Sequence, residues 1–200
     1  MKKQFVLLLV ATVWLAAFRL PDALELGAKM PKPDIKMKDV TGKEISLNDA
    51  KKSNGLLVMF SCNTCPYVAR NQERTREICH FALKNNIGVI LINSNEAERD
   101  GGDSYAAMQS YAKKQSYAWY YAVDKNNEIA DAFAADRTPE CYLFNKDAVL
   151  VYKGAIDDNP GSAADVSQKY LHNAMNAILT GKAVEVSSSA SVGCGIKRKM

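Results

Sequence analysis

The chain has 200 residues, of which 48% are hydrophobic and 24% are charged. This length and composition fit one compact globular domain and argue against a disordered, collagenous or disulfide-scaffold protein. The net charge of +4 comes from the two ends of the chain, so the nearly neutral body lacks the basic surface that nucleic-acid binding needs.

The first 23 residues have the pattern of a targeting segment. Lys2 and Lys3 precede an apolar run, Phe5–Phe18, that is shorter than the roughly 20 residues needed to cross a bilayer. A basic start and a short apolar run are typical of a secretory signal peptide. An uncleaved N-terminal anchor, and with it a membrane tether, is the alternative. Either one predicts a periplasmic or otherwise extracytoplasmic protein, in a compartment where disulfides are permitted.

The body of the chain, which we place at residues 31–186, begins with a predicted hairpin. Apolar positions lie on both sides of Thr41-Gly42, and Ser46 is placed to cap a short helix. The continuous apolar run at 56–60 predicts a strand that is buried on both faces. Helical spacing of apolar residues then predicts a helix over 68–83.

Strands and helices alternate through the next part of the chain. Residues 89–92 form the second predicted buried strand, and 104–115 form a helix. Residues 119–123 predict a third strand, and 127–134 predict a short helix. This alternation indicates parallel strands with helices between them.

The rest of the body predicts a hairpin, 141–144 with 149–152, and a last helix over 163–179. Residues 187–200 are small and polar and then basic, which predicts a flexible tail. The complete order predicts an α/β fold, a mixed sheet flanked by helices on both faces. In such sheets, chemistry gathers at the carboxyl ends of the parallel strands, and the junction after Phe60 is such an end.

The chemistry of the chain is expected at Cys62-Asn63-Thr64-Cys65, directly after that strand. Two cysteines three residues apart can close a small disulfide with little movement of the backbone. We expect Cys62 at the helix N-terminus, where free backbone N–H groups favour the attacking thiolate. Cys65 would lie one turn farther in, placed to resolve a mixed disulfide. A Cys-x-x-Cys in a strand–helix pattern is a fairly specific redox signal.

Three other uses of these cysteines fit the pattern less well. A zinc half-site would need a second pair of ligands at a recognisable spacing, which the sequence does not offer. A copper chaperone would use the two thiolates with a histidine or methionine, and no histidine is expected near the site. A purely structural disulfide does not account for the placement at a helix start.

A second element is Arg137-Thr138-Pro139, just before the predicted strand at Cys141. A proline before a strand is often only an element boundary. Beside a Cys-x-x-Cys, a cis proline facing the disulfide would leave the preceding backbone free to pair with a substrate strand. It would also keep metals off the thiolates. Arg137 is a possible accessory residue that would add positive charge near Cys62, or it is simply solvated.

The three remaining cysteines have different predicted roles. Cys79 and Cys141 fall on apolar faces and are expected to be small core residues. Cys194 is the odd cysteine, in the tail. It is either a free thiol without a role or a third redox thiol that docks onto the sheet and exchanges with the Cys62–Cys65 pair.

The chain resembles the redoxin (alkyl hydroperoxide reductase/thiol-specific antioxidant) family, in its peroxiredoxin-like subgroup. The motifs that carry the resemblance cover most of residues 31–197. They are Cys62-Asn-Thr-Cys-Pro-Tyr-Val68, Ile92-Asn-Ser-Asn-Glu-Ala-Glu-Arg99, Thr138-Pro-Glu140, Gly154-Ala-Ile-Asp-Asp-Asn-Pro160 and Gly193-Cys-Gly-Ile-Lys197. The first and the last are the most specific.

This resemblance implies a thioredoxin-like fold with an N-terminal β-hairpin extension and an inserted strand–helix unit before Pro139. It also implies that Cys62 is the nucleophile, that Cys65 is the resolving thiol and that Pro139 is cis. Thr138, which precedes that proline, would belong to the same site. Relatives often carry a cysteine at the position of Arg137, so this chain departs from the family pattern there.

A peroxidase function is not supported by the motif spacing. Peroxiredoxins use Pro-x-x-x-Thr/Ser-x-x-Cys, in which the hydroxyl helps to stabilise the departing peroxide oxygen. Counted back from Cys65, the proline and hydroxyl positions hold Val58 and Cys62. Counted back from Cys62, they hold Gly55 and Met59. Neither frame fits, whereas dithiol exchange needs only an activated thiolate, a resolving thiol and an accessible groove.

The sequence therefore predicts an exported thiol–disulfide oxidoreductase, an enzyme that needs no cofactor and no metal. Its expected partners are protein or small-molecule thiols and an upstream thiol donor or acceptor. A thiol-dependent peroxidase with antioxidant activity and a non-catalytic copper- or thiol-binding module are the alternatives. Asp124 and Glu140 are the candidates for a buried carboxylate that accepts a proton from the resolving thiol.

Overall fold

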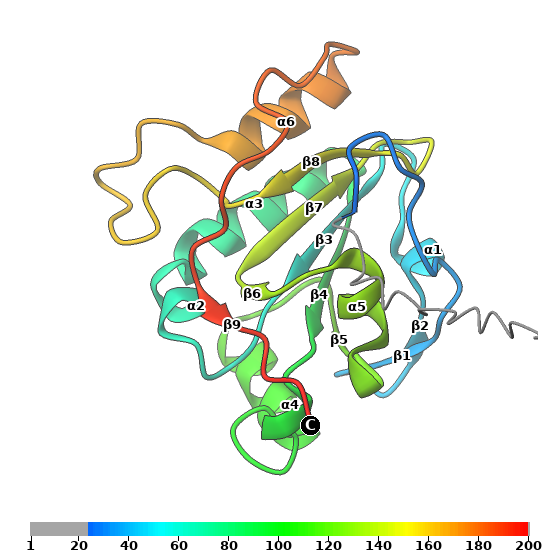
Figure 1. The fold of residues 1–200 in the computed structure, drawn as a ribbon, viewed down its shortest axis with the longest axis vertical. Coiled ribbons are helices and arrows are strands. Elements are labelled where there is room, and N and C mark those ends of the chain that lie inside the picture. The colour runs from blue at the N-terminus through cyan, green and yellow to red at the C-terminus, as the bar shows by residue number, and fades with distance from the viewer. Residues whose placement is uncertain (1–23, 200) are drawn as a thin grey trace, which may run out of the picture.

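The computed structural model describes residues 24–199, and the expected targeting segment at residues 1–23 lies outside the described residues (Figure 1). A seven-stranded sheet forms the centre, in the order β2-β1-β5-β4-β3-β7-β8. Its strands are β1 (Met37–Asp39), β2 (Glu44–Ile45), β3 (Leu56–Phe60), β4 (Gly88–Asn93), β5 (Tyr120–Val123), β7 (Glu140–Phe144) and β8 (Leu150–Gly154). Within residues 24–199, no helix has the length and apolar character to cross a membrane.

The sheet is mixed, as the order of the predicted elements indicated. Strands β3, β4 and β5 run parallel to one another, so their carboxyl ends share one edge. Strand β7 runs antiparallel to β3 and places Glu140 opposite Phe60. Strand β8 is antiparallel to β7, and β1 is antiparallel to β5. The turn before β7 therefore meets the turn after β3.

Helices cover both faces of the sheet, and each face has its own hydrophobic core. Helices α1 (Leu47–Ala50) and α5 (Glu128–Phe133) pack on one face, and α3 (Gln72–Lys84), α4 (Tyr105–Lys114) and α6 (Tyr170–Leu179) pack on the other. Alternate residues of β3 enter the two cores, because side chains of a strand point to opposite faces. Cys79 and Cys141 are buried in the second core, which confirms their prediction as small core residues.

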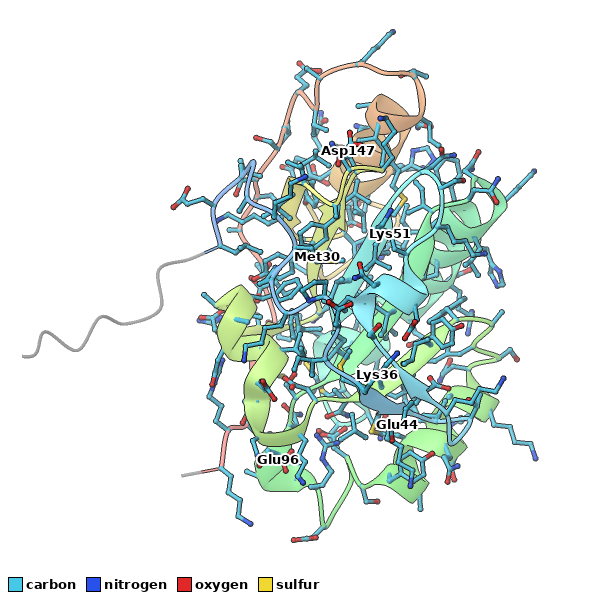
Figure 2. All side chains as sticks on the ribbon, turned by 90° about the vertical axis from the view of Figure 1, so that its right-hand side faces the viewer. Met30, Lys36, Glu44, Lys51, Glu96 and Asp147 are labelled. Carbon is cyan, nitrogen blue, oxygen red and sulfur yellow. The ribbon has the colours of Figure 1, made fainter. Side chains whose placement is uncertain are left out.

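The β1–β2 hairpin closes one edge of the sheet. Gly42 adopts a φ of +87° in its turn, a conformation that glycine reaches without strain. Ser46 caps α1 as predicted, and Asp49 completes a capping box. On the same side of the molecule, Met30 is buried against the core, whereas Lys36 and Glu44 stand at the surface (Figure 2).

Two helices stand where the sequence predicted one over 68–83. Helix α2 (Pro66–Arg70) ends at Asn71, and α3 begins at the next residue. The Asn71 side-chain amide donates to the carbonyl of Tyr67, 2.8 Å away, and to that of Pro160. A side chain that bonds to backbone carbonyls in this way competes with the helical ladder, which accounts for the interruption.

The last helix begins at Tyr170, so the prediction of a start at residue 163 is wrong. Asp158 holds the preceding segment as a closed loop. Its amide donates to the carbonyl of Gln168, and its carboxylate accepts from the amide of Ser167. A helix that began at residue 163 would need the Ser167 amide and the Gln168 carbonyl for its own hydrogen bonds.

The C-terminal tail lies against the domain, which differs from the flexible tail that its composition predicted. Strand β9 (Cys194–Gly195) pairs antiparallel with β6 (Arg137–Thr138) in a separate two-stranded sheet. From α6 the tail runs past α2 to β9 (Figure 1), and its last residues bond to the loop after β4 and to α5, where Lys197 pairs with Glu98 and Arg198 with Asp131. Backbone pairing with a specific partner strand holds this segment, and composition alone does not reveal such a contact.

Candidate active site

Cys62 and Cys65 lie in the turn between β3 and α2, at the edge where the parallel strands end. Cys62 follows β3 by two positions, and Cys65 is the N-cap of α2. The expectation that Cys62 stands at the helix N-terminus is wrong, because the helix begins at Pro66. Proline is favoured as the first helical residue, where the missing N–H has no helical partner to lose. Both thiols are buried, with 1% and 3% of their surfaces exposed.

The turn before β7 brings Thr138 onto these thiols. The sulfur of Cys62 lies 3.4 Å from the hydroxyl oxygen of Thr138, and the sulfur of Cys65 lies 3.2 Å from the carbonyl oxygen of the same residue. The Thr138-Pro139 peptide bond is cis, as the family resemblance implied. Four residues that the sequence assigned to one site therefore meet, although the two pairs are far apart in the chain.

The guanidinium of Arg137 does not contact the sulfur of Cys62. It is exposed, its guanidinium donates to the carbonyl of Gly193 over 3.4 Å, and its Nε lies 3.7 Å from a carboxylate oxygen of Asp136. Its contacts therefore serve the C-terminal tail rather than the sulfur of Cys62, where the sequence had suggested added positive charge.

Cys194 of the C-terminal tail lies beside the two buried thiols and contacts Cys65. Its sulfur lies 2.7 Å from the sulfur of Cys65 and is only partly buried. Cys62, Cys65 and Val68 of α2 form a small apolar cluster, and Tyr67 and Cys194 pack against it. The tail thus brings a third sulfur into contact with the Cys-x-x-Cys motif.

The environment shifts the pKa values of Cys62 and Cys65 in opposite directions. A hydrogen bond from the Cys62 thiol lowers the pKa of Cys65 to about 4, and the Cys194 thiol and the amides of Val68 and Cys194 act in the same direction against burial. The shared proton raises the pKa of Cys62, and burial and the charge of Asp103 raise it further. Cys65 is therefore the more acidic of the two thiols.

This proton distribution predicts a thiolate that persists in mild acid. Thiolate absorbance near 240 nm should fall by about one sulfur equivalent as the pH is lowered through about 4, because the folded pKa of Cys65 is depressed. Below that pH, the Cys65 thiol would donate to the Thr138 carbonyl. Cys65→Ser should abolish the step. A reduced wild-type protein whose thiolates appear only above about pH 8 would contradict the arrangement.

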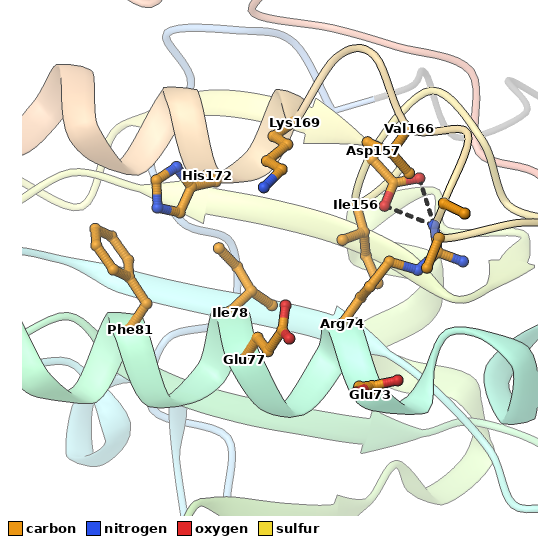
Figure 3. A pocket seen from close by; sticks show the side chains of 12 residues that line it. Glu73, Arg74, Glu77, Ile78, Phe81, Ile156, Asp157, Val166, Lys169 and His172 are labelled. Atoms are coloured by element: carbon orange, nitrogen blue, oxygen red, sulfur yellow. Dashed lines mark hydrogen bonds and ion pairs between the residues drawn. The ribbon is translucent and has the colours of Figure 1, made fainter.

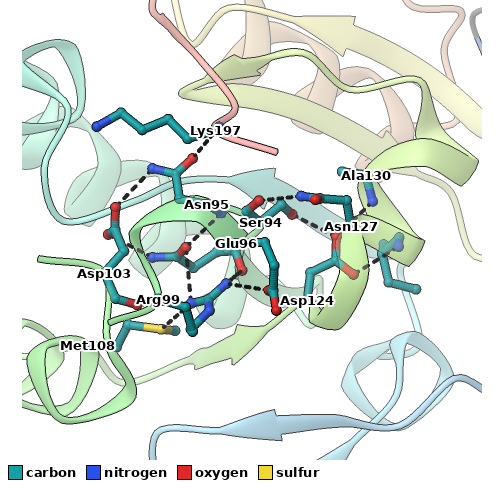
Figure 4. Close-up of polar contacts among 12 residues, drawn as sticks. Ser94, Asn95, Glu96, Arg99, Asp103, Met108, Asp124, Asn127, Ala130 and Lys197 are labelled. Atoms are coloured by element: carbon teal, nitrogen blue, oxygen red, sulfur yellow. Dashed lines mark hydrogen bonds and ion pairs between the residues drawn. The ribbon is translucent and has the colours of Figure 1, made fainter. Parts of the chain in front are cut away.

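A buried carboxylate, Asp103, supports the Cys62–Cys65 turn. It accepts a hydrogen bond from the Asn63 amide at 2.7 Å and from the Thr64 hydroxyl at 2.9 Å. Side-chain amides of Asn93 and Asn95 donate to the same carboxylate, each over 2.9 Å. Figure 4 shows Asp103 beside Asn95 and Arg99. The carboxylate therefore bonds to the backbone and a side chain between the two cysteines.

Sequence reasoning treated residues 100–103 as a plain loop and so missed Asp103. The available signal was Asn93-Ser94-Asn95, a polar cluster that directly follows a buried strand at the active edge of the sheet. Side-chain amides that are buried in such a place need polar partners. The sequence did not show which carboxylate would supply them.

The two carboxylates proposed as proton acceptors have other partners. Asp124 accepts hydrogen bonds from the amides of Ile129 and Ala130 and from the Ser94 hydroxyl, so it holds the start of α5. Glu140 accepts from the amides of Asp136 and Arg137. Burial raises the pKa of both groups. Asp103, by contrast, bonds to Asn63 and Thr64 within the motif itself.

A separate groove of about 620 Å³ lies between α3 and α6 (Figure 3). Arg74 and Asp157 form a buried ion pair at one end, and the rings of Phe81 and His172 lie 4.5 Å apart at the other. None of the proposed redox residues lines this groove. In the described part of the chain, no group of three or more His, Cys, Asp or Glu side chains is arranged to hold a metal ion.

Comparison with known proteins gives the site a context. The model of the AhpC/TSA family matches residues 27–153. Thiol-disulfide oxidoreductase ResA of Bacillus cereus is 21% identical over 142 residues, which are 71% of this chain and 76% of ResA.

Solved structures extend the comparison to most of the chain. An uncharacterized conserved protein from Geobacillus kaustophilus is 31% identical, with a TM-score of 0.82 and coverage of 89% of this chain and 94% of that one. The thioredoxin domain of a thiol-disulfide oxidoreductase from Bacteroides vulgatus is 17% identical, with a TM-score of 0.53 over 66% and 89% of the two chains. The predicted thioredoxin-like α/β fold is confirmed.

Proposed function

This chain belongs to the AhpC/TSA family and is an oxidoreductase of the thioredoxin type, and we propose that it catalyses thiol–disulfide exchange through Cys62 and Cys65. The observation that carries the proposal is the position of the two buried sulfurs at a strand–helix junction, 3.4 Å and 3.2 Å from the hydroxyl and the carbonyl of Thr138, where the pKa of Cys65 is lowered. Such a pair holds one thiolate near neutral pH, and the thiolate is the reactive form in exchange.

The proposed reaction passes two electrons from the cysteine pair to a substrate disulfide in two successive attacks, and each released substrate sulfur takes up one proton. Cys65 accepts the proton of Cys62, and the Cys62 thiolate attacks one sulfur of a substrate disulfide. The other substrate sulfur leaves as a thiolate and takes up a proton. Cys65, again deprotonated, then attacks the sulfur of Cys62 in the mixed disulfide. The second substrate thiol is released, and the Cys62–Cys65 disulfide remains; the reverse sequence oxidises a partner.

Thr138 and Pro139 have separate proposed roles. The Thr138 hydroxyl lies at 3.4 Å from Cys62, and its contact lowers the pKa of that thiol and so stabilises the attacking thiolate. The backbone of Arg137–Thr138 has the extended form of a strand and is proposed to pair with a substrate strand. Pro139 has no N–H group to present at this edge.

The test is the redox equilibrium of Cys62 and Cys65 in a Cys194→Ser variant, which removes the third sulfur. The protein would be equilibrated in glutathione buffers, quenched with acid and alkylated. A reversible Cys62–Cys65 disulfide is expected. A potential near about −270 mV would indicate a reductase and one near about −120 mV an oxidant. If no reversible disulfide forms, the exchange mechanism is wrong.

The same samples separate the two alternative functions. A peroxidase would consume peroxide far faster than free cysteine does, whereas we expect a rate close to that of an ordinary thiolate, since neither cysteine has the peroxiredoxin motif around it. A copper-binding module would retain Cu(I) against a chelator and show no exchange. Either result would replace the proposed function.

We also propose that the protein is exported and that its partners are protein thiols or disulfides, together with an upstream thiol donor or acceptor. The basic and apolar pattern of residues 1–23 supports export. We propose residues 31–186 as the redox domain, with residues 187–200 as a segment of its own. Fractionation of cells that make the full chain would test export: a protein found only in the cytoplasm would contradict it.

A further inference from the structure

The C-terminal tail occupies the edge that the proposed function reserves for a substrate strand. Strand β9 pairs with β6 in a register that sets Cys194 opposite Thr138 and Gly195 opposite Arg137. The cysteine of the tail therefore lies on the edge where a substrate strand is proposed to pair, and its sulfur contacts Cys65 of the motif.

Hydrogen bonds of the two residues after β9 fix this register. The Ile196 amide donates to the carbonyl of Asp136, and the Lys197 amide donates to the side-chain carbonyl of Asn95 at 3.0 Å. Asn95 in turn donates to Asp103, so the anchor of the tail and the support of the Cys62–Cys65 turn belong to one network (Figure 4).

Glycine is required where the tail passes Thr138. A Cβ atom on Gly193 would lie 2.1 Å from the Thr138 carbonyl oxygen and 2.7 Å from the Thr138 carbonyl carbon. Backbone atoms cannot rotate away from such a contact as a side chain can. At Gly195, by contrast, the nearest atom to an added Cβ is 3.9 Å away. Only the first of these two glycines is needed for the docked position.

The three cysteines differ in their exposure to solvent. Cys62 and Cys65 are buried with the tail in place, whereas Cys194 is partly exposed. A thiol arriving from solvent reaches Cys194 first, and Cys194 is in contact with Cys65.

We propose that Cys194 is the third redox thiol of this centre and exchanges with the Cys62–Cys65 disulfide at Cys65. The Cys194 sulfur loses its proton and attacks the sulfur of Cys65. The Cys62–Cys65 bond breaks, the Cys65–Cys194 bond forms, and Cys62 leaves as a thiolate that takes up a proton. No electrons are gained or lost overall. This inference rests on the proposed function, because it starts from the Cys62–Cys65 disulfide.

The consequence is a relay between the substrate and the external thiol. The oxidised protein without substrate carries the Cys65–Cys194 disulfide and a free Cys62. An external dithiol then attacks the exposed Cys194 and returns Cys65 and Cys194 to the thiol form. Substrate disulfides react at Cys62, while donor thiols react at Cys194.

The experiment maps the disulfides of the full chain after oxidation with oxidised glutathione, acid quenching, alkylation, proteolysis and mass spectrometry. We expect Cys65–Cys194 to exceed Cys62–Cys65 in the wild type and in Gly195→Ala. In Gly193→Ala the ratio should fall by about tenfold or more, which requires only about 1.4 kcal/mol from the backbone clash. A fall in Gly193→Ala but not in Gly195→Ala would show that the ratio depends on docking of the tail and not on an added methyl group in general.

Two outcomes would overturn this inference. One is a wild-type protein that forms Cys62–Cys65 and never Cys65–Cys194. The other is an equal ratio in Gly193→Ala and Gly195→Ala, both folded as judged by circular dichroism. Failure of the proposed function has a different signature, because Cys194→Ser would then lack a reversible Cys62–Cys65 disulfide as well.

Discussion

Replacing Cys62 with serine is expected to slow the reduction of a protein disulfide, with a dithiol as electron donor, by about a thousandfold or more. Serine does not ionise near neutral pH, so the attack on the substrate disulfide loses its nucleophile. The turnover of purified variants measures the effect. Cys79→Ala is the matched control, because Cys79 is a buried residue of α3 that faces the core and lies outside the site. Its turnover should stay within about threefold of the wild type.

Cys65→Ser distinguishes the roles of the two cysteines within the same prediction. Without the resolving thiol, the mixed disulfide between Cys62 and a substrate should accumulate and survive an acid quench. Peptide mapping would locate the trapped substrate. Trapping in Cys62→Ser through Cys65, and none in Cys65→Ser, would reverse the proposed order of attack.

Replacing Asp103 with alanine is expected to lower the free energy of unfolding by about 3 kcal/mol or more. Asp103 is fully buried and accepts four hydrogen bonds from donors around the Cys62–Cys65 turn. Alanine leaves those donors without their acceptor, and each unsatisfied buried group is costly. Urea unfolding followed by circular dichroism gives the free energy directly.

Asp100→Ala is the control for that stability measurement. Asp100 lies in the same loop but is exposed, so its replacement should change the free energy of unfolding by less than about 0.5 kcal/mol. Equal losses in the two variants would show that the loop, rather than the buried carboxylate, sets the stability. A loss below about 1 kcal/mol in Asp103→Ala would contradict the support that Asp103 gives to the turn.

Strongly patterned segments of the fold were predictable from the sequence. The apolar run of β3 has every residue buried, so its composition alone indicated a central strand. Ser46 and Ser104 cap α1 and α4 at the predicted starts, because capping is a local property of the chain. The start of α6 was mispredicted since its limit comes from Asp158, whose partners in the loop are not visible in a helical pattern.

In the candidate site, the sequence predicted only those residues that a short motif or a fixed separation along the chain marks. Cys62 and Cys65 follow from their separation, and Thr138 and Pro139 from their position before a strand. The N-cap position of Cys65 could have been predicted from Pro66, which marks the first residue of α2. The contacts of Asp103 and Cys194 join segments distant in sequence.

The close passage of Gly193 over Thr138 also limits which polypeptides can use this edge. Any chain that pairs with Arg137–Thr138 in the register of β9 sets the residue before its cysteine against the Thr138 carbonyl, where an added Cβ would lie 2.1 Å from the oxygen. A glycine-cysteine pair fits this space without adjustment, and a bulkier neighbour forces the peptide outward. Under the proposed function, the limited space at this edge would favour disulfide peptides whose cysteine follows glycine.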